Sequence, residues 1–525
     1  MTNTQERDST APVQHAGEEH VIAAEPLTHD QVDKWWFQDG GLLRLYFLIF
    51  IAVLSSATNG YDGSMMNGLQ TLTYWQDYFH NPHGSTQGLL NAIQSVGGVC
   101  ALPFAPNLSD KLGRKKTIFI GCLIVALGVG LQSGARNIGM FIAGRYFIGM
   151  GSGISAVASP LLITELCHPQ QRGKLTAVYN TFWYFGSTIA AWTTFGTLQL
   201  QSNLSWRLPS LFQFIPSFIQ VVLIWFLPES PRFLISRDQN EKALAIMTKY
   251  HANGNPESEW LRFEFSEIRA SLRLEKESAK SQWKDLFKTP GNRRRMLICI
   301  SCGLFSQLSG TGLVSYYLGK VLNDIGITDP TFQNKINGIY AVTNWVEASG
   351  AAFLVDRFGR RPLFLLSNSV MVCTFAIWIA LTAIQNRTGS ASIGSGVICM
   401  IFFHSFFYNI VWVSLNVAYP AEILPYHLRA KGLTVLNLSI SCALFFGQYV
   451  NPIGIERLGW KYYIFYEVWL VIELIIVFFF FIETQGSTLE EISQTFDGKE
   501  AVENVKVLAL EKANYTAAEE YAGRV

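Results

Sequence analysis

Two charged residues, Asp62 and Arg145, lie in stretches of the chain that are otherwise apolar. A charged side chain at membrane depth costs several kcal/mol unless it is paired or hydrated, so an ionisable residue there is a candidate for function. Arg145 is the natural partner of Asp62. A neutral Asp would release the Arg and an ionised Asp would hold it, so proton binding could bias a conformational equilibrium. The alternative is a static ion pair that braces two helices.

A second set of charged residues occurs twice, in short polar loops between apolar stretches. Each copy has an Asp-x-x-Gly-Arg turn, then a Glu, and then an Arg seven residues after that Glu. The members are Asp110, Gly113, Arg114, Glu165 and Arg172 in the first copy, and Asp356, Gly359, Arg360, Glu422 and Arg429 in the second. A repeated pattern of this kind indicates a duplicated half, the way in which many transporters build a central site.

The chemistry of these loops suggests an inner gate. The Gly permits a tight turn between antiparallel helices, and the Asp is expected to accept hydrogen bonds from backbone N–H groups at the start of the next helix, where the helix dipole favours an anion. The Arg is expected to meet the Glu at another helix end. The alternative is that the basic residues only set the topology of the chain.

Long membrane helices must position all these residues. The 525-residue chain is 49% hydrophobic and only 15% charged, whereas about 25% charged is usual in soluble proteins. A helix of about 20 apolar residues crosses the hydrocarbon core of a bilayer. We therefore predict an all-α polytopic membrane protein with two six-helix halves. The twelve expected spans are 43–66, 87–108, 117–134, 138–160, 174–197, 208–228, 296–321, 335–355, 362–384, 394–419, 431–451 and 462–482.

Basic residues gather in loops of one parity, while the opposite loops 67–86 and 321–334 contain no Lys or Arg. The positive-inside rule then places both termini and the central loop in the cytoplasm. The expected segments are a disordered tail, the N-terminal half, a helical linker, the C-terminal half and a second tail, over 1–42, 43–228, 229–295, 296–482 and 483–525. Within the linker, 239–252 and 257–280 have helix-like sequences.

Several motifs together resemble the sugar porter family of the major facilitator superfamily. They are Gly144-Arg145, Pro160-Leu-Leu-Ile-Thr-Glu165, Pro228-Glu-Ser-Pro-Arg232, Gln307-Leu-Ser-Gly310 with Tyr316-Tyr317, and Glu483-Thr-Gln-Gly486. The resemblance extends from about residue 44 to 497 and is greatest to fungal lactose and cellobiose permeases. It implies that Asp62 and Arg145 form a proton site.

The same resemblance implies which residues contact a sugar: Asn180, Gln307, Asn344, Tyr316 and Tyr317. Neutral amides and hydroxyls suit this role because sugar hydroxyls both donate and accept hydrogen bonds. Three positions depart from the family pattern towards smaller side chains, namely Ser306, Gly312 and Val417. A larger or differently shaped site follows, so the expected function is sugar:proton symport at the plasma membrane, with a disaccharide such as lactose or cellobiose as substrate.

The sequence also bears on other classes of function. No phosphate-binding loop, metal-ligand cluster or nucleophile–base set is recognisable, so we expect no enzyme, cofactor or metal, and the net charge of +1 gives no sign of nucleic acid. A proton-independent facilitator, a porter of a hexose, polyol or other small metabolite, and a non-transporting sugar sensor remain as alternatives. Asn386-Arg-Thr is a candidate glycosylation site. A monomer is expected to suffice, because each chain holds both halves.

Overall fold

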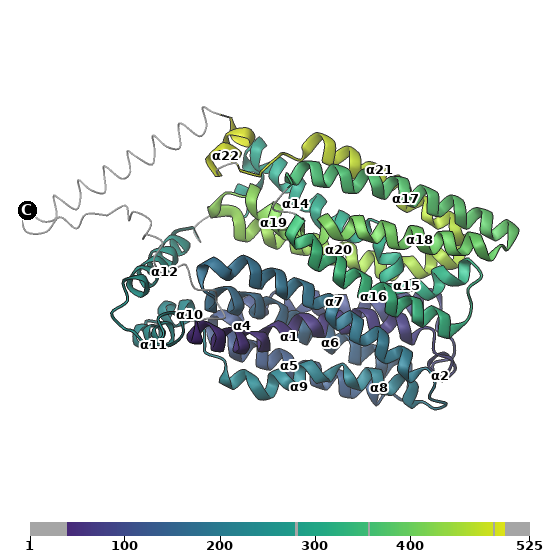
Figure 1. Ribbon diagram of the computed structural model, residues 1–525, viewed down its shortest axis with the longest axis horizontal. Coiled ribbons are helices and arrows are strands. Elements are labelled where there is room, and N and C mark those ends of the chain that lie inside the picture. The colour runs from purple at the N-terminus through teal and green to yellow at the C-terminus, as the bar shows by residue number, and fades with distance from the viewer. Residues whose placement is uncertain (1–38, 279–281, 355–357, 487–488, 499–525) are drawn as a thin grey trace, which may run out of the picture.

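The computed structural model describes residues 39–278, 282–354, 358–486 and 489–498. The described residues form helices and no strands, and the helices gather into two bundles that lie side by side (Figure 1). Asp356 and most of both predicted tails lie outside these residues. We call the end of the bundles that carries the basic loops at 110–116 and 360–361 the inner end, and the opposite end the outer end.

The helices of the N-terminal half follow the predicted spans closely. They are α1 (Gly40–Leu69), α3 (Gly84–Ala101), α4 (Ala105–Leu112), α5 (Arg114–Ser133), α6 (Ile138–Leu166), α7 (Arg172–Thr197), α8 (Leu204–Phe212) and α9 (Phe214–Leu223), with the short α2 (Thr73–Tyr78) in an outer loop. The spans expected at 87–108 and 208–228 are each two consecutive helices, and α3 meets α4 at an angle of 46°.

The C-terminal half repeats this arrangement. Its helices are α14 (Pro290–Leu308), α15 (Thr311–Asp324), α16 (Pro330–Leu354), α17 (Arg360–Thr388), α18 (Ala391–Tyr408), α19 (Leu415–Ile423), α20 (Tyr426–Leu458) and α21 (Tyr463–Phe480). The predicted span 296–321 is broken at Gly310, whose φ of 87° lies in the left-handed region that favours glycine. A π-helical turn, Asn409–Val413, interrupts the span 394–419.

Length and hydropathy alone select eight candidate membrane spans in the described residues, or nine if the bent pair α3–α4 counts as one. One of the eight, Leu428–Phe480, contains both α20 and α21. The predicted spans that fail the hydropathy test are those of α7 and α16, which pack against each other across the two halves. Their polarity therefore marks a helix face that is turned towards the other half rather than towards lipid.

The linker forms a small helical layer at the inner end (left in Figure 1). It contains α10 (Pro231–Ser236), α11 (Asn240–His251), α12 (Glu259–Ser278) and α13 (Asp285–Lys288). The helices expected at 239–252 and 257–280 are therefore present. In the C-terminal tail, α22 (Leu489–Asp497) docks on α14, where Arg295 binds Asp497 with N–O distances of 3.0 and 2.7 Å.

Candidate functional site

Asp62 and Arg145 meet in the interior of the N-terminal half. Asp62 on α1 and Arg145 on α6 are each only 1% exposed, and the Arg145 Nη1 donates to Asp62 Oδ1 at 3.2 Å. The second guanidinium nitrogen, Nη2, donates to Gln94 Oε1 on α3 at 2.9 Å. The pair is therefore not the bidentate fork that Arg and carboxylate usually prefer, because Gln94 shares the guanidinium. Sequence reasoning identified the pair and missed Gln94.

A glycine brings these helices close enough for the contact. A Cβ on Gly149 would lie 2.0 Å from the backbone oxygen of Gln94, so only glycine permits this approach of α6 to α3. Gly149 is one turn after Arg145 on the same helix. Gly149 thus allows the close approach of α6 and α3 that brings Gln94 to Arg145.

A polar cluster lies between the two halves where α7 faces α16. Asn409, in the π-helical turn, donates from Nδ2 to Asn344 Oδ1 at 2.5 Å and to Glu347 Oε2 at 2.8 Å. The Tyr184 hydroxyl on α7 donates to Asn409 Oδ1 at 2.9 Å. Sequence reasoning named Asn344 alone. Glu347 could have been found by the criterion applied to Asp62, since it is an ionisable residue within a predicted span.

The other predicted sugar contacts are spread around this cluster. Among the described residues, half-buried Gln307 donates one long hydrogen bond, 3.4 Å, to Ser306 Oγ. Tyr316 is half-buried, and its ring lies beside Gly63, the residue after Asp62. Asn180 is an exposed residue on α7. The structure therefore brings Asn344 into a tight polar cluster and does not join Gln307 or Asn180 to it.

Tyr317 has a different place from Tyr316. It is wholly buried, its hydroxyl accepts from Asn91 Nδ2 at 2.9 Å, and the same hydroxyl donates to the backbone oxygen of Gln448. Asn91 belongs to α3 in one half, and Gln448 to α20 in the other. Tyr317 is thus part of a seal between the halves.

Further hydrogen bonds extend that seal at the outer end. Asn67 on α1 donates to the Val314 oxygen and to Asn337 Oδ1, each at 3.1 Å, and accepts from the Leu318 backbone at 3.0 Å. Ser95 donates to Gln448 Oε1 at 2.6 Å. These bonds connect α1 and α3 with α15, α16 and α20. The described conformation is therefore closed at the outer end.

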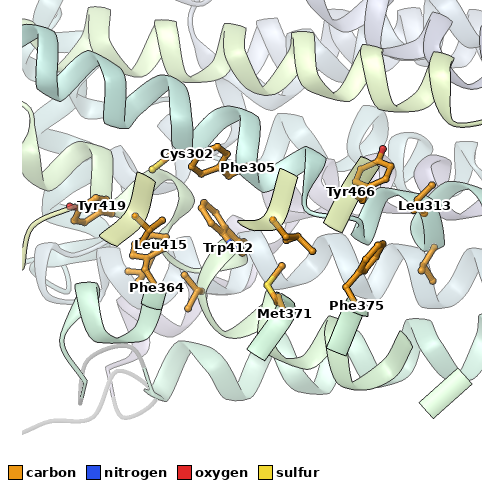
Figure 2. Close-up of a cluster of buried hydrophobic side chains, with 14 of the residues drawn as sticks. Cys302, Phe305, Leu313, Phe364, Met371, Phe375, Trp412, Leu415, Tyr419 and Tyr466 are labelled. Atoms are coloured by element: carbon orange, nitrogen blue, oxygen red, sulfur yellow. The ribbon is translucent and has the colours of Figure 1, made fainter. Parts of the chain in front are cut away.

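Trp412, an aromatic residue within a predicted span, lies inside the C-terminal half. It is 1% exposed and packs in the core of the C-terminal half against Phe305 and Phe364 (Figure 2). Its indole nitrogen donates to Asn368 Oδ1 at 3.1 Å. An aromatic residue in a span usually packs, and this one does.

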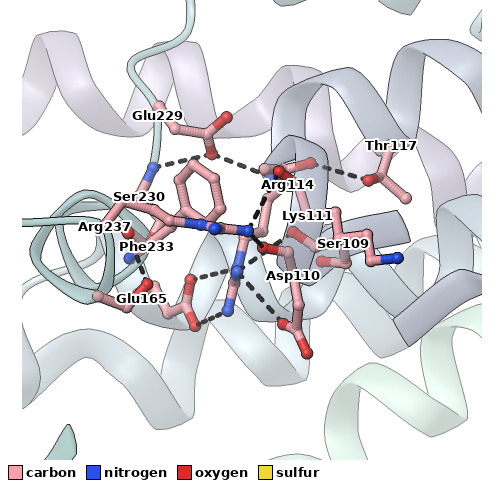
Figure 3. Close-up of polar contacts among 12 residues, drawn as sticks. Ser109, Asp110, Lys111, Arg114, Thr117, Glu165, Glu229, Ser230, Phe233 and Arg237 are labelled. Carbon is pink, nitrogen blue, oxygen red and sulfur yellow. Dashed lines mark hydrogen bonds and ion pairs between the residues drawn. The ribbon is translucent and has the colours of Figure 1, made fainter. Parts of the chain in front are cut away.

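At the inner end, Arg114 lies between several acidic residues (Figure 3). Its Nε and Nη2 bind the two carboxylate oxygens of Glu165 at 2.9 and 3.0 Å, and its Nη1 lies 3.6 Å from the exposed Asp110. In the C-terminal half, Arg360 Nη2 binds Glu422 Oε1 at 3.2 Å. Each Arg therefore meets the Glu of its own half. These contacts join helices within a half, and their role as a gate stays a prediction.

The expected helix cap by Asp110 is wrong. The backbone N–H groups of Arg114 and Lys115 donate to Glu229 at 3.1 and 3.4 Å, whereas those of Arg360 and Arg361 donate to Glu483 at 2.9 and 3.1 Å. A carboxylate does occupy the positive end of each helix dipole. It arrives from a distant part of the chain, which the local spacing of Asp110 could not reveal.

The two capping carboxyl groups differ in burial and therefore in pKa. Burial raises the pKa of Glu229, although backbone N–H donors including those of Ser230 and Lys115 act to lower it. Glu483 is more exposed; burial acts to raise its pKa too, but donors including Gln485 and Arg360 lower the pKa overall. The glycines of the turns make room for these caps. A Cβ on Gly113 would lie 2.5 Å from Glu229, and one on Gly359 would lie 2.5 Å from Glu483.

Only Gly113 also serves the turn as predicted. Its φ is 94°, whereas Gly359 has an ordinary φ of −57°. Arg172 and Arg429 form no ion pair with any residue that the structure describes, and Arg429 donates at 3.4 Å to the Leu424 oxygen. Asn386 is exposed in the last turn of α17.

The family model for sugar (and other) transporters matches residues 48–496, which is most of the chain. The chain belongs to the sugar transporter family. The chain is 29% identical over 491 residues to a high-affinity glucose transporter of Kluyveromyces lactis, covering 90% of this chain and 87% of the relative. It is 30% identical over 468 residues to a high glucose sensor of Saccharomyces cerevisiae, covering 85% of this chain and 60% of the relative.

A solved structure confirms the fold class of the chain. The inward open xylose transporter of E. coli superposes with a TM-score of 0.72 at 21% identity, covering 86% of this chain and all of that one. At this identity the similarity establishes the major facilitator fold alone. In another of its solved structures, that E. coli protein is named as a proton:xylose symporter. The family match over residues 48–496 confirms the predicted membership of the sugar porters.

Proposed function

We propose that this member of the sugar transporter family is a sugar:proton symporter of the plasma membrane that works by alternating access. The observation that carries the proposal is the buried Asp62–Arg145 pair, held by one hydrogen bond of 3.2 Å while Gln94 shares the guanidinium. An ion pair that permanently joins two helices would be stronger with two parallel hydrogen bonds between Arg and carboxylate. A pair held by one bond needs only one proton on Asp62 to separate, and Gln94 then keeps Arg145 hydrogen-bonded.

The mechanism couples this separation to the movement of the two halves. Tyr316 lies beside the turn of α1 that carries Asp62, since a Cβ on Gly63 would lie 4.0 Å from its ring. Its own backbone oxygen accepts from Gln70 at 3.3 Å in the outer seal. Loss of the charge on Asp62 therefore changes the field at a residue of the seal. A proton can shift the equilibrium between outward and inward forms only by such differential contacts.

Sugar is proposed to bind between α7 and the C-terminal half. Asn344, Gln307 and Tyr316 supply neutral donors and acceptors there, and Asn180 supplies another towards the inner end of α7. The leading substrate is a disaccharide, because Ser306, Gly312 and Val417 leave more room than the family pattern does. The Arg114–Glu165 and Arg360–Glu422 pairs are proposed to stabilise the inner ends of the helices when the inner side closes. Both termini are placed in the cytoplasm, and the functional unit is a monomer.

Uptake in cells that lack sugar transporters tests this proposal. Labelled lactose, cellobiose, glucose and xylose are offered with and without a protonophore, and Asp62→Asn is measured beside the native chain. We expect accumulation of a disaccharide by the native chain, its loss with protonophore, and equilibration without accumulation by the variant. Accumulation that survives in Asp62→Asn would falsify the proton assignment.

A sensor is the second candidate, because one relative is a glucose sensor. This candidate predicts that none of the four sugars enters the cell, while sugar still changes the expression of a reporter gene. Entry that reaches equilibrium and ignores the protonophore would instead identify a facilitator.

A further inference from the structure

Glu347 is a carboxylate within a predicted membrane span, and no motif accounts for it. It lies on α16, three residues after Asn344, so that both side chains share one face of the helix. It is half-buried, and its Oε2 accepts from Asn409 Nδ2 at 2.8 Å. A carboxylate at membrane depth is costly unless it is paired or hydrated, so Glu347 is a candidate for function.

No cation balances Glu347 within the part of the chain that the structure describes. Asn409 supplies the one neutral hydrogen bond given above. Asp62 has the cation Arg145 as its partner, whereas Glu347 has no such partner among the described residues. The carboxylate of Glu347 is therefore not part of a structural ion pair.

The surrounding cluster is complete without Glu347 Oε1. Asn409 uses both hydrogens of its amide, one on Asn344 and one on Glu347, and its oxygen accepts from Tyr184. Glu347 Oε1 takes part in none of these bonds, and the side chain is only half-buried. A ligand can therefore reach this carboxylate beside the amide of Asn344.

We propose that Glu347 is a specificity-determining residue, which accepts hydrogen bonds from a pair of neighbouring hydroxyls on the transported sugar. The inference rests on the proposed function. An ionised carboxylate only accepts hydrogen bonds, so it selects substrates that present donors at that place. Tyr184 belongs to the opposite half, so a sugar that takes over its contacts also acts on the link between the halves.

The test compares Glu347→Gln with the native chain, using the sugar that the native chain takes up best. Glutamine keeps the size of the side chain but replaces one acceptor oxygen by a donor. A hydrogen bond to a charged group contributes about 1.5–3 kcal/mol, which corresponds to about a 10- to 100-fold rise in KM. Monodeoxy analogues of the same sugar are measured as competitors. In the native chain at least one analogue should compete about tenfold more weakly than the parent sugar, and in the variant that difference should disappear.

Two controls separate specificity from folding. Glu467→Gln makes the same change in another membrane helix, α21, and should keep the native analogue profile. Glu347→Asp keeps the charge on a shorter side chain and should retain discrimination with a raised KM, even if the Gln variant fails to reach the membrane. The amount of each variant at the cell surface is measured in parallel.

The outcomes also distinguish this inference from the proposed function. Glu347→Gln with native KM and native analogue profile overturns the role of Glu347 while sugar transport stands. Uptake of no sugar by the native chain overturns the proposed function itself, and the role of Glu347 with it.

Discussion

Three carboxylates in the membrane helices have three different environments. Asp62 is paired with Arg145, Glu347 accepts from Asn409, and Glu473 on α21 is wholly buried with no hydrogen bond to either oxygen from the described residues. The indole N–H of Trp469 lies near Glu473 but forms no hydrogen bond of normal geometry with it or with another described residue. Burying a polar group without a partner costs about 1–3 kcal/mol. Residue type alone does not separate these cases; the partner of each carboxylate does.

The unpaired carboxyl group of Glu473 leads to a prediction about the stability of the protein. Replacing Glu473 with Met, a side chain of similar length without polar atoms, should stabilise the protein by about 1–3 kcal/mol, because the unsatisfied group is removed. The measurement is thermal unfolding of the purified protein in detergent. Glu473→Gln is the matched control, and it should gain less because its amide remains polar. A lower unfolding temperature for Glu473→Met than for the native chain would show that the carboxyl group makes favourable contacts.

At the scale of elements, distant segments hold the helix ends at the inner side. Glu229 and Glu483 cap α5 and α17, and His251 at the end of α11 joins the linker to the membrane helices. His251 Nδ1 lies 2.8 Å from Glu264 Oε2 on α12, and its Nε2 lies 2.9 Å from the backbone oxygen of Leu166 at the end of α6. Both neighbours are acceptors, so only the doubly protonated imidazole donates to both.

From this contact we predict that the helices of the linker become less stable as the pH rises. Burial acts to lower the pKa of His251, but the hydrogen bond and charge of Glu264 and the Leu166 oxygen raise it overall. A raised pKa stabilises the folded form fully below the ordinary value of about 6.5, and this stabilisation is lost as pH rises through the folded pKa. Hydrogen exchange of α11 and α12, corrected for intrinsic rates, should therefore accelerate above about pH 6.5.

His251→Gln is the control for that measurement. It should exchange faster than the native chain at low pH and lose the pH-dependent change, because Gln does not titrate. An equal pH dependence in both proteins would assign the effect to another group.

At the scale of the whole molecule, the bonds between the halves gather at the outer end. Asn67, Asn91 and Ser95 of the N-terminal half bind Asn337, Tyr317 and Gln448 of the C-terminal half. Alternating access requires such contacts to break once in every cycle. The seal should therefore be a state that the protein leaves, rather than a permanent interface.

A cross-link across the seal tests this point. Ser95 donates to the end of the Gln448 side chain at 2.6 Å, and a Cys at 448 is shorter than Gln, so a short bifunctional thiol reagent is needed to span the gap. A bis-methanethiosulfonate of this kind should link Ser95→Cys to Gln448→Cys and abolish uptake, because the outer side can no longer open. A reducing agent should restore uptake. Each single variant treated with the same reagent is the control, since the chain has eight cysteines of its own. Full uptake by the cross-linked protein would mean that the halves need not separate there.

The family, the helical class, the approximate spans and the candidate pair Asp62–Arg145 can all be predicted from the amino-acid order. They depend on runs of apolar residues and on local motifs, which are present in the order of residues along the chain. Only the folded structure shows that Glu229 and Glu483, not Asp110, cap the inner helices, and that Gln94 shares Arg145. It also shows that Trp412 lies in a core, while Glu347 reaches the cluster between the halves. Each of these outcomes depends on which helix faces lie opposite one another, and packing across the fold sets that relation.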